Sequence, residues 1–300
     1  MKNLKGMLLA LAAGCCWGLS GTMGQYMFDI QHTDAAALTV IRMISSGIVL
    51  LCITFFGNPS DLKKVWETKK SSAVLVMFAV FGLAAVQYSY MKAIDVSNAG
   101  TATALQYTGE VLILLEACIA QRRLPKKSEG FGVLLALTGI FLIATHGSIN
   151  NMVLSKEALF WGGITAFTLM LYTVLPARLI RCYGSKPVTG YGMILGGVVL
   201  WAIFRPDFGV FNIWGIAALA VIVLVGTVFA YTAFLHAASE IGSVPAALLA
   251  SVEVVSAPFF SALLLGSKFT VYDCGGFLCM LLMAVMLALP ELRKTHSGAV

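Results

Sequence analysis

Long apolar stretches recur along almost the whole chain, and this pattern constrains the fold more than any other feature. Each runs for about 20 residues, the length of helix that crosses the hydrocarbon core of a bilayer. Hydrophobic residues make up 59% of the 300 residues and charged residues 11%, whereas roughly 25% of a soluble domain is charged. The polar gaps are too short to hold a soluble catalytic lobe or an ectodomain. The sequence therefore predicts a protein that works within the membrane.

The apolar stretches predict an all-α membrane protein with ten transmembrane helices. A sheet with open edges is excluded, because its backbone groups would lack hydrogen bonds in lipid. Since the links are short, consecutive helices are expected to run antiparallel. The predicted spans are 6–27, 35–56, 73–91, 99–120, 130–145, 158–179, 188–204, 213–237, 243–265 and 271–289.

Lysine and arginine predict the orientation of these spans. With the N-terminus inside, fifteen of these residues fall in cytoplasmic segments and four in outer segments. Positive charge is typical of cytoplasmic loops. We therefore expect both termini to be cytoplasmic, in the cytoplasmic membrane of a bacterium. The same bias explains the net charge of +6 without a nucleic-acid partner.

No motif in the sequence indicates a cofactor or a metal. The seven cysteines show no Cys-x-x-Cys spacing, and five of them fall within apolar stretches. The chain has neither a Walker loop nor a His-Glu-x-x-His sequence. We expect no cofactor, no metal and no nucleic acid, with the bilayer and a small-molecule substrate as partners.

The two halves of the chain resemble each other. YSYMKAIDVSNAGTA at 88–102 matches YTAFLHAASEIGSVPA at 231–246, and Arg123-Leu124 with Gly130 matches Lys268-Phe269 with Gly275. The spacing is about 143 residues at the first match and about 145 at the second. Two five-helix repeats, 1–150 and 151–300, are predicted to join near Asn150. Because five is odd, the second repeat enters from the opposite side, an inverted repeat typical of secondary transporters.

Several segments resemble a known family. They are the Trp17-Gly18 pair, the small-residue turn between the third and fourth helices, the basic loop QRRLPKKSEGFG and the pattern LLALTGIFLI. Together they resemble the EamA family of the drug/metabolite transporter superfamily. This resemblance implies ten helices, with the fifth and tenth set apart from the substrate pathway, and transport of small organic solutes without ATP.

Three ionisable residues within the spans are candidates for substrate binding or coupling. Glu110 and Glu253 lie midway along the equivalent fourth and ninth helices, offset by two residues in the register taken from the loops. Because a charge at the bilayer centre costs about 2.5–3.5 kcal/mol, each is expected to face a cavity or a partner. Such a carboxylate can exchange a proton for a cationic solute, or can lock helix packing by pairing with Arg42. For Arg42 the ion pair is favoured over direct binding of a substrate carboxylate.

Aromatic and amide side chains are the other candidates for the site. They offer ring stacking, a cation–π wall or hydrogen bonds to a solute. The candidates are Trp17, Gln87, Tyr88, Tyr90, Gln106, Tyr107, Tyr172 and Tyr231. Aromatic residues near the ends of spans are assigned to lipid-facing belts instead. These are Tyr26, Trp161, Trp201 and Trp214.

The sequence favours a secondary transporter that moves a small amphipathic metabolite or drug, such as an amino acid or an amine, by alternating access. Export is the favoured direction, and the chain is not expected to be an enzyme. One alternative is a proton-coupled importer or facilitator of a small organic cation. An alternative of another class is a membrane enzyme or lipid flippase, which would need clustered His, Asp or Arg at one interface, and the sequence shows no such cluster.

Overall fold

The computed structural model describes residues 2–148 and 152–297. Within those residues every regular element is a helix, and ten spans are long and apolar enough to cross a membrane. The all-α prediction and the predicted number of spans are therefore confirmed. The predicted boundary between the halves, near Asn150, lies outside the described residues.

The first half contains five spans. They are α1 (Lys2–Asp29), α2 (Ala35–Gly57), the run α4 (Lys69–Met77), η1 (Phe78–Ala84) and α5 (Ala85–Asp95), the pair α6 (Ala99–Tyr107) and α7 (Gly109–Ala120), and α8 (Lys127–Thr145). A short helix, α3 (Ser60–Lys64), lies in the link after α2. The η1 segment is a π-helical stretch within a continuous span.

The second half repeats this order. Its spans are α9 (Lys156–Val174) with α10 (Ala177–Tyr183), α11 (Ser185–Phe204), the run α12 (Ile213–Ala220), η2 (Val221–Phe229) and α13 (Ala230–Ile241), the pair α14 (Ser243–Ala250) and α15 (Glu253–Leu265), and α16 (Val271–Ser297). The π-helical segment and the two-part helix recur in equivalent spans. The local backbone irregularities are therefore part of the repeat.

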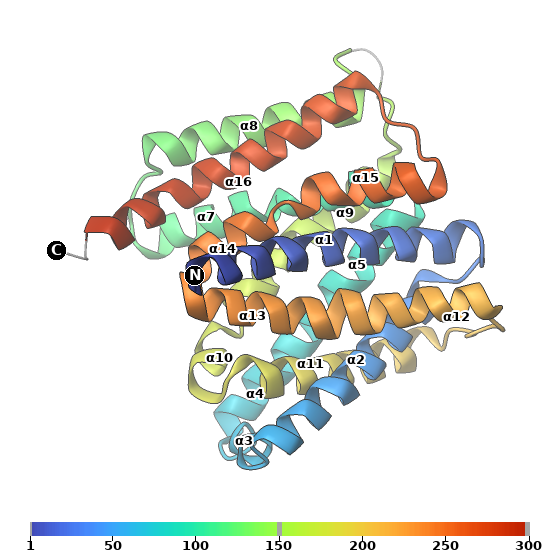
Figure 1. Cartoon of the computed structure of the whole chain (residues 1–300), viewed down its shortest axis with the longest axis vertical. Coiled ribbons are helices and arrows are strands. Elements are labelled where there is room, and N and C mark those ends of the chain that lie inside the picture. The colour runs from blue at the N-terminus through green and yellow to red at the C-terminus, as the bar shows by residue number, and fades with distance from the viewer. Residues whose placement is uncertain (1, 149–151, 298–300) are drawn as a thin grey trace.

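The first helix of each half packs against helices of the other half, as expected of an inverted repeat. In the middle of the bundle α1 packs against α13 and α15, while its counterpart α9 packs against α5 and α6. The helix α2 packs along its own counterpart α11, and α8 along α16 (Figure 1). The pair of α8 and α16 lies at one edge of the molecule. The tenth helix is nevertheless not set apart from the central cavity described below, because Ala284, Leu287 and Ala288 of α16 line it.

The start of α1 and the end of α16 lie at the same end of the bundle, at the left of Figure 1. We call this the amino end, and the opposite end the far end. Because neighbouring spans are antiparallel, the position of a residue along its helix tells which end it is near.

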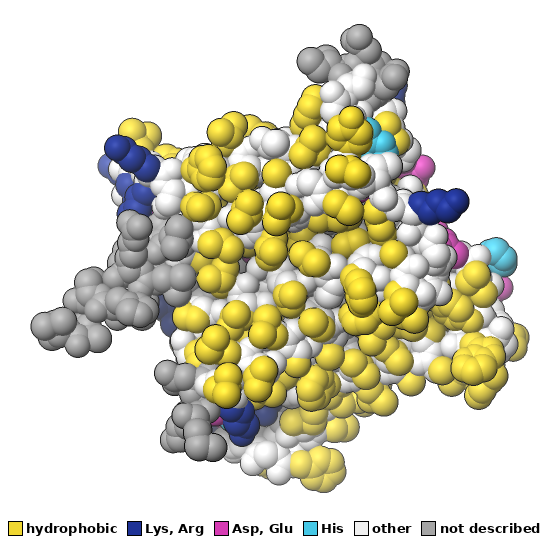
Figure 2. Space-filling model, turned by 45° about the horizontal axis from the view of Figure 1, so that its top comes forward, with side chains coloured by type: hydrophobic (Ala, Val, Ile, Leu, Met, Phe, Trp, Pro, Cys, Tyr) yellow, Lys and Arg dark blue, Asp and Glu magenta, His cyan; other side chains and the backbone are white. Residues whose placement is uncertain are grey.

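The outer surface is that of a protein surrounded by lipid. Figure 2 shows hydrophobic side chains spread over a broad face, with Lys, Arg, Asp, Glu and His side chains gathered towards its edges. Large apolar side chains such as Leu134, Phe160 and Leu263 are more than half exposed. An apolar surface of this extent is typical of a membrane interface. The protein is therefore a multi-pass membrane protein.

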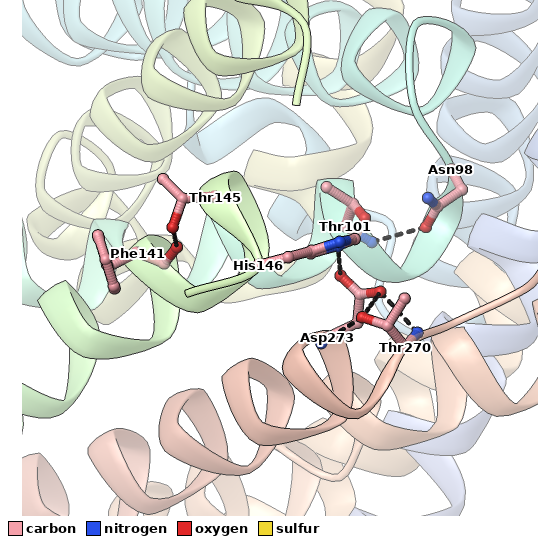
Figure 3. Close-up of polar contacts among 7 residues, drawn as sticks. All are labelled: Asn98, Thr101, Phe141, Thr145, His146, Thr270 and Asp273. Atoms are coloured by element: carbon pink, nitrogen blue, oxygen red, sulfur yellow. Dashed lines mark hydrogen bonds and ion pairs between the residues drawn. The ribbon is translucent and has the colours of Figure 1, made fainter. Parts of the chain in front are cut away.

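Polar contacts tie the two edge helices together at the far end (Figure 3). The carboxylate of Asp273 accepts hydrogen bonds from the backbone N–H and the hydroxyl of Thr270, each at 2.8 Å. The Thr270 hydroxyl accepts the N–H of Asp273 at 3.3 Å, so the two residues form a capping box at the start of α16. Its other oxygen lies 3.1 Å from Nε2 of His146, which ends α8. Nearby, Asn98 caps α6 by accepting the N–H of Thr101 at 2.8 Å. The contact between His146 and Asp273 joins the two repeats at an edge away from the centre of the bundle.

Candidate functional site

A cavity of about 660 Å³ lies between the two repeats, within the range typical of small-molecule sites. Its walls come from α1, α2, α5, η1, α6, α7, α9, α13, α14, α15 and α16, together with Ser251 between α14 and α15. Residues such as Arg42 and Tyr90 line its inner part, and Ala247 and Ala288 line the part nearer the amino end. The cavity thus runs from the middle of the bundle towards the amino end.

The structure brings together nine of ten residues that the sequence predicts for the site. These cavity-lining residues are Trp17, Arg42, Gln87, Gln106, Tyr107, Glu110, Tyr172, Tyr231 and Glu253. Tyr90, also considered above, lines the cavity too. Tyr88 does not, because its ring packs on Trp161 and Phe204 instead. Whether these residues bind a solute stays a prediction.

Two helix interruptions position the glutamates. The hydroxyl of Thr108 donates to the carbonyl of Leu105 at 2.6 Å, and the hydroxyl of Ser251 donates to that of Leu248, also at 2.6 Å. Each interruption is a tight turn with backbone bonds between residues three apart. Glu110 and Glu253 then fall in the first turns of α7 and α15. The positive end of a helix dipole stabilises a carboxylate there.

These interruptions also correct the predicted register. Thr108 precedes Glu110 by two residues, as Ser251 precedes Glu253. The two glutamates are therefore equivalent in the repeat, and the predicted offset between them is wrong. The insertion that shifts the loop-based register lies after the glutamates, towards α8 and α16.

The two glutamates have different surroundings. Glu253 is 8% exposed, and one of its oxygens accepts a hydrogen bond from the hydroxyl of Tyr107 at 3.3 Å. Glu110 lines the cavity without a hydrogen bond or ion pair to another described residue. The pair of carboxylates is thus equivalent in sequence and unequal in structure.

Arg42 is 6% exposed and faces the same cavity from α2. Its Nε is buried without a hydrogen-bond partner. Across the described chain, no ion pair joins the guanidinium to Glu110, Glu253 or another acid. The structural ion pair favoured by sequence reasoning is therefore not formed.

Aromatic rings form much of the remaining wall. The ring of Trp17 meets that of Tyr231 edge-on at 5.8 Å between centroids, and that of Phe234 at 5.4 Å. The hydroxyls of Tyr231 and Tyr172 are 2.8 Å apart and hydrogen-bonded. Rings held in this way offer a rigid surface for stacking on a solute.

A second aromatic cluster occupies the equivalent place in the other repeat. Trp161 lies on α9 as Trp17 lies on α1, and it meets Tyr88 edge-on at 5.6 Å. Phe204 stacks on the other side of Tyr88 at 4.7 Å. The assignment of Trp161 to a lipid-facing belt is therefore wrong, because its ring packs against an aromatic cluster between the repeats.

The far end of the central helices is held by a polar cluster. The side-chain oxygen of Gln25 accepts hydrogen bonds from the backbone N–H of Ala99 and from Ser261, at 3.1 and 2.7 Å. Its nitrogen donates to Ser267 at 3.1 Å. This cluster joins α1 and α6 to α15 and the loop that follows it.

Sequence reasoning missed several lining residues, including Leu83, Leu169, Phe234 and Ser251. Leu and Phe are indistinguishable from lipid-facing residues in an apolar stretch. The repeat offered one signal for Ser251, because Thr108 is its counterpart. Within the described part of the chain, no three His, Cys, Asp or Glu side chains are grouped so that they would hold a metal ion.

Comparison with known proteins places the chain in a family. Residues 4–145 and 156–289 each match the EamA-like transporter family. An uncharacterized inner membrane transporter of Salmonella typhimurium, YicL, is 33% identical over 296 residues, which cover 98% of each chain. The chain belongs to the EamA-like transporter family, as the sequence resemblance predicted.

More distant relatives are also transporters by name. An uncharacterized transporter of Archaeoglobus fulgidus is 27% identical over 80% of this chain and 82% of its own. One solved structure, described as the crystal structure of a protein, superposes with a TM-score of 0.64 at 16% identity, covering 96% of this chain and 98% of that chain. That likeness supports the fold alone.

Proposed function

We propose that this transporter moves a small organic metabolite or drug across the cytoplasmic membrane by alternating access. The observation that carries the proposal is the central cavity, which is lined by residues of both repeats in the middle of the bundle and towards the amino end. At the far end the Gln25 cluster joins the helices. A solute site that is reached from one side at a time is what alternating access requires.

The paired aromatic clusters support this mechanism. Trp17 with Tyr231 lines the cavity, whereas the counterpart cluster of Trp161 with Tyr88 is packed shut. In an inverted repeat the two halves can exchange conformations. In the alternative state, the cluster of Trp161 and Tyr88 opens towards the far end, and that of Trp17 and Tyr231 closes.

The charge pattern supports an orientation with the amino end in the cytoplasm. Fifteen lysines and arginines then lie in cytoplasmic segments and four in outer segments. In this orientation the cavity faces the cytoplasm, and a solute binds from that side. This arrangement is the one expected of an exporter.

Glu110 and Glu253 are the residues we propose for coupling to protons. Both are carboxylates at the start of half-helices in the cavity wall, and neither is neutralised by an ion pair among the described residues. A carboxylate in that position changes its protonation when its access to water changes sides.

A two-stage experiment tests the proposal. Thermal stabilisation in detergent, screened over amino acids, hydroxy acids, amines, nucleobases and drugs, selects the class that binds. Uptake of a radiolabelled member of that class is then measured in proteoliposomes, against liposomes without protein. Saturable counterflow supports transport, and binding without movement of the solute across the membrane contradicts it.

A further inference from the structure

The cavity holds a buried cation that forms no ion pair or hydrogen bond with another described residue. The Arg42 side chain is 6% exposed, and its Nε has no hydrogen-bond partner. Its terminal nitrogens likewise donate no hydrogen bond to another described residue. A buried charge without a partner is strongly destabilising, so a guanidinium in this state indicates a role other than packing.

The surrounding hydroxyl groups do not act as hydrogen-bond partners of Arg42. The hydroxyl of Tyr90 is hydrogen-bonded to Thr103 at 2.8 Å, and those of Tyr172 and Tyr231 bond to each other at 2.8 Å. Tyr107 donates to Glu253. None of these hydroxyls forms a hydrogen bond with the guanidinium, and the open space beside Arg42 is the cavity itself.

A second unsatisfied group points into the same space. The side-chain oxygen of Gln106 is buried, lines the cavity and has no hydrogen-bond donor. An unpaired acceptor and an unpaired cation in one cavity are together satisfied by a ligand that carries an anionic group and an N–H or O–H donor.

The charged side chains of the cavity wall limit the charge of the anion that can bind. The wall holds two carboxylates, Glu110 and Glu253, and one guanidinium. A dianion such as a phosphate monoester would add repulsion from both carboxylates, whereas a single carboxylate matches the fork of the guanidinium with one charge. We infer that Arg42 is the substrate-binding residue for a small monocarboxylate that also carries a hydroxyl or amine donor, held by Gln106. This inference rests on the proposed transport function and names its substrate class.

Binding to matched compounds tests the inference in the purified full-length protein. The probes are phenyllactate and phenylalanine, their amides, phenethylamine and phenyl phosphate, each titrated by thermal shift in detergent. We expect the two carboxylates to stabilise the protein, and the amides, amine and phosphate to bind at least tenfold more weakly. The inference is overturned if no carboxylate binds, or if an amide, the amine or the phosphate binds as well as its carboxylate counterpart.

Variants separate binding from a structural role. Arg42→Gln is expected to weaken carboxylate binding by about 10- to 100-fold, the loss for a hydrogen bond to a charged group, and Arg42→Lys by less. Without ligand, Arg42→Gln should melt no lower than the unmodified protein, because it removes an unpaired buried charge. The exposed Arg178→Gln is the matched control and should change neither readout.

A lower melting temperature of Arg42→Gln with unchanged carboxylate affinity would assign Arg42 to packing and overturn the inference. If phenethylamine binds in place of the carboxylates and is transported in proteoliposomes, the inference fails while the transport function stands. If a carboxylate binds through Arg42 but does not cross the membrane, the transport function fails while the binding assignment stands.

Discussion

At the scale of single residues, the cavity gathers polar side chains of the membrane-spanning segments, among them Arg42, Gln106 and Glu253. An ionisable or amide side chain in a membrane span is costly to expose to lipid, so it faces a cavity or a polar partner. The residue type alone therefore predicted that Arg42, Gln106 and Glu253 line the cavity. Aromatic residues are ambiguous, because Tyr88 and Tyr90 are two residues apart and face different surroundings. Apolar lining residues such as Phe234 carry no signal, since lipid and cavity walls accept the same side chains.

Replacing the aromatic wall is expected to weaken binding. Trp17→Ala removes the ring that packs on Tyr231 and Phe234, and Tyr107→Ala also frees Glu253. We expect each to lower affinity about tenfold, corresponding to ~1.4 kcal/mol, while the protein stays monodisperse. Thermal-shift titration with the hit from the screen measures this. Trp214→Ala, on a ring that is 71% exposed, is the control. Unchanged affinity in both cavity variants would place the site elsewhere.

Replacing the glutamates tests coupling at the same scale. Glu110→Gln and Glu253→Gln keep shape and hydrogen bonding but remove titration. If either carries the proton, its variant should exchange substrate across vesicles and fail to concentrate it under an imposed proton gradient. Uptake with and without the gradient measures the difference. If both variants retain accumulation at the rate of the unmodified protein, neither glutamate couples transport to protons.

At the scale of elements, the number of spans and their order followed from hydropathy, because the bilayer fixes helix length. The interruptions at Thr108 and Ser251 did not, since single Thr and Ser residues also occur within continuous membrane helices. The π-helical segments η1 and η2 did not either, since residues there are as apolar as their neighbours. The predicted register of the repeat was wrong at the glutamates because it was taken from loops, where insertions are tolerated. The equivalence of Glu110 and Glu253 became visible only from the interrupted helix turns that precede them.

Close packing of the central helices is expected to be sensitive to single methyl groups. A Cβ on Gly14 of α1 would overlap the backbone carbonyl of Ala250, which ends α14. Gly163 of α9 has no atom within 4 Å of a Cβ built there. Gly14→Ala should therefore lower stability by about 1–3 kcal/mol, whereas Gly163→Ala should leave it unchanged or raise it. Melting in detergent compares the two, and equal effects would contradict this packing.

At the scale of the whole molecule, the inverted repeat followed from an odd number of helices in each half, and the packing of α1 and α9 agrees with it. Which end faces the cytoplasm rests on charge alone. The conformation was not predictable, because the aromatic clusters of Trp17 with Tyr231 and of Trp161 with Tyr88 are equivalent in the repeat, and sequence does not tell which of them lines the cavity.

Topology is tested by labelling single cysteines in a variant that lacks the seven native ones. Cysteines placed at Lys64 and Lys126 lie at the amino end, and one at His32 lies in the far-end link after α1. In intact cells, an impermeant thiol reagent should label His32→Cys and leave the other two unlabelled until the cells are opened. Labelling of the amino-end positions from outside would reverse the orientation.

The central claim is that solute crosses because the far end of the bundle opens while the amino end closes. Cysteines at Gln25 and Ser267, whose side chains are 3.1 Å apart, allow a short bifunctional thiol reagent to hold the far end shut. The control pair replaces Asn58 and Asp61, also 3.1 Å apart, within one link at the amino end. With the far end cross-linked, we predict that proteoliposome transport is lost, binding from the amino end is kept, and reduction restores transport, while the control pair transports throughout. Transport at the unmodified rate through fully cross-linked protein would contradict alternating access in this transporter.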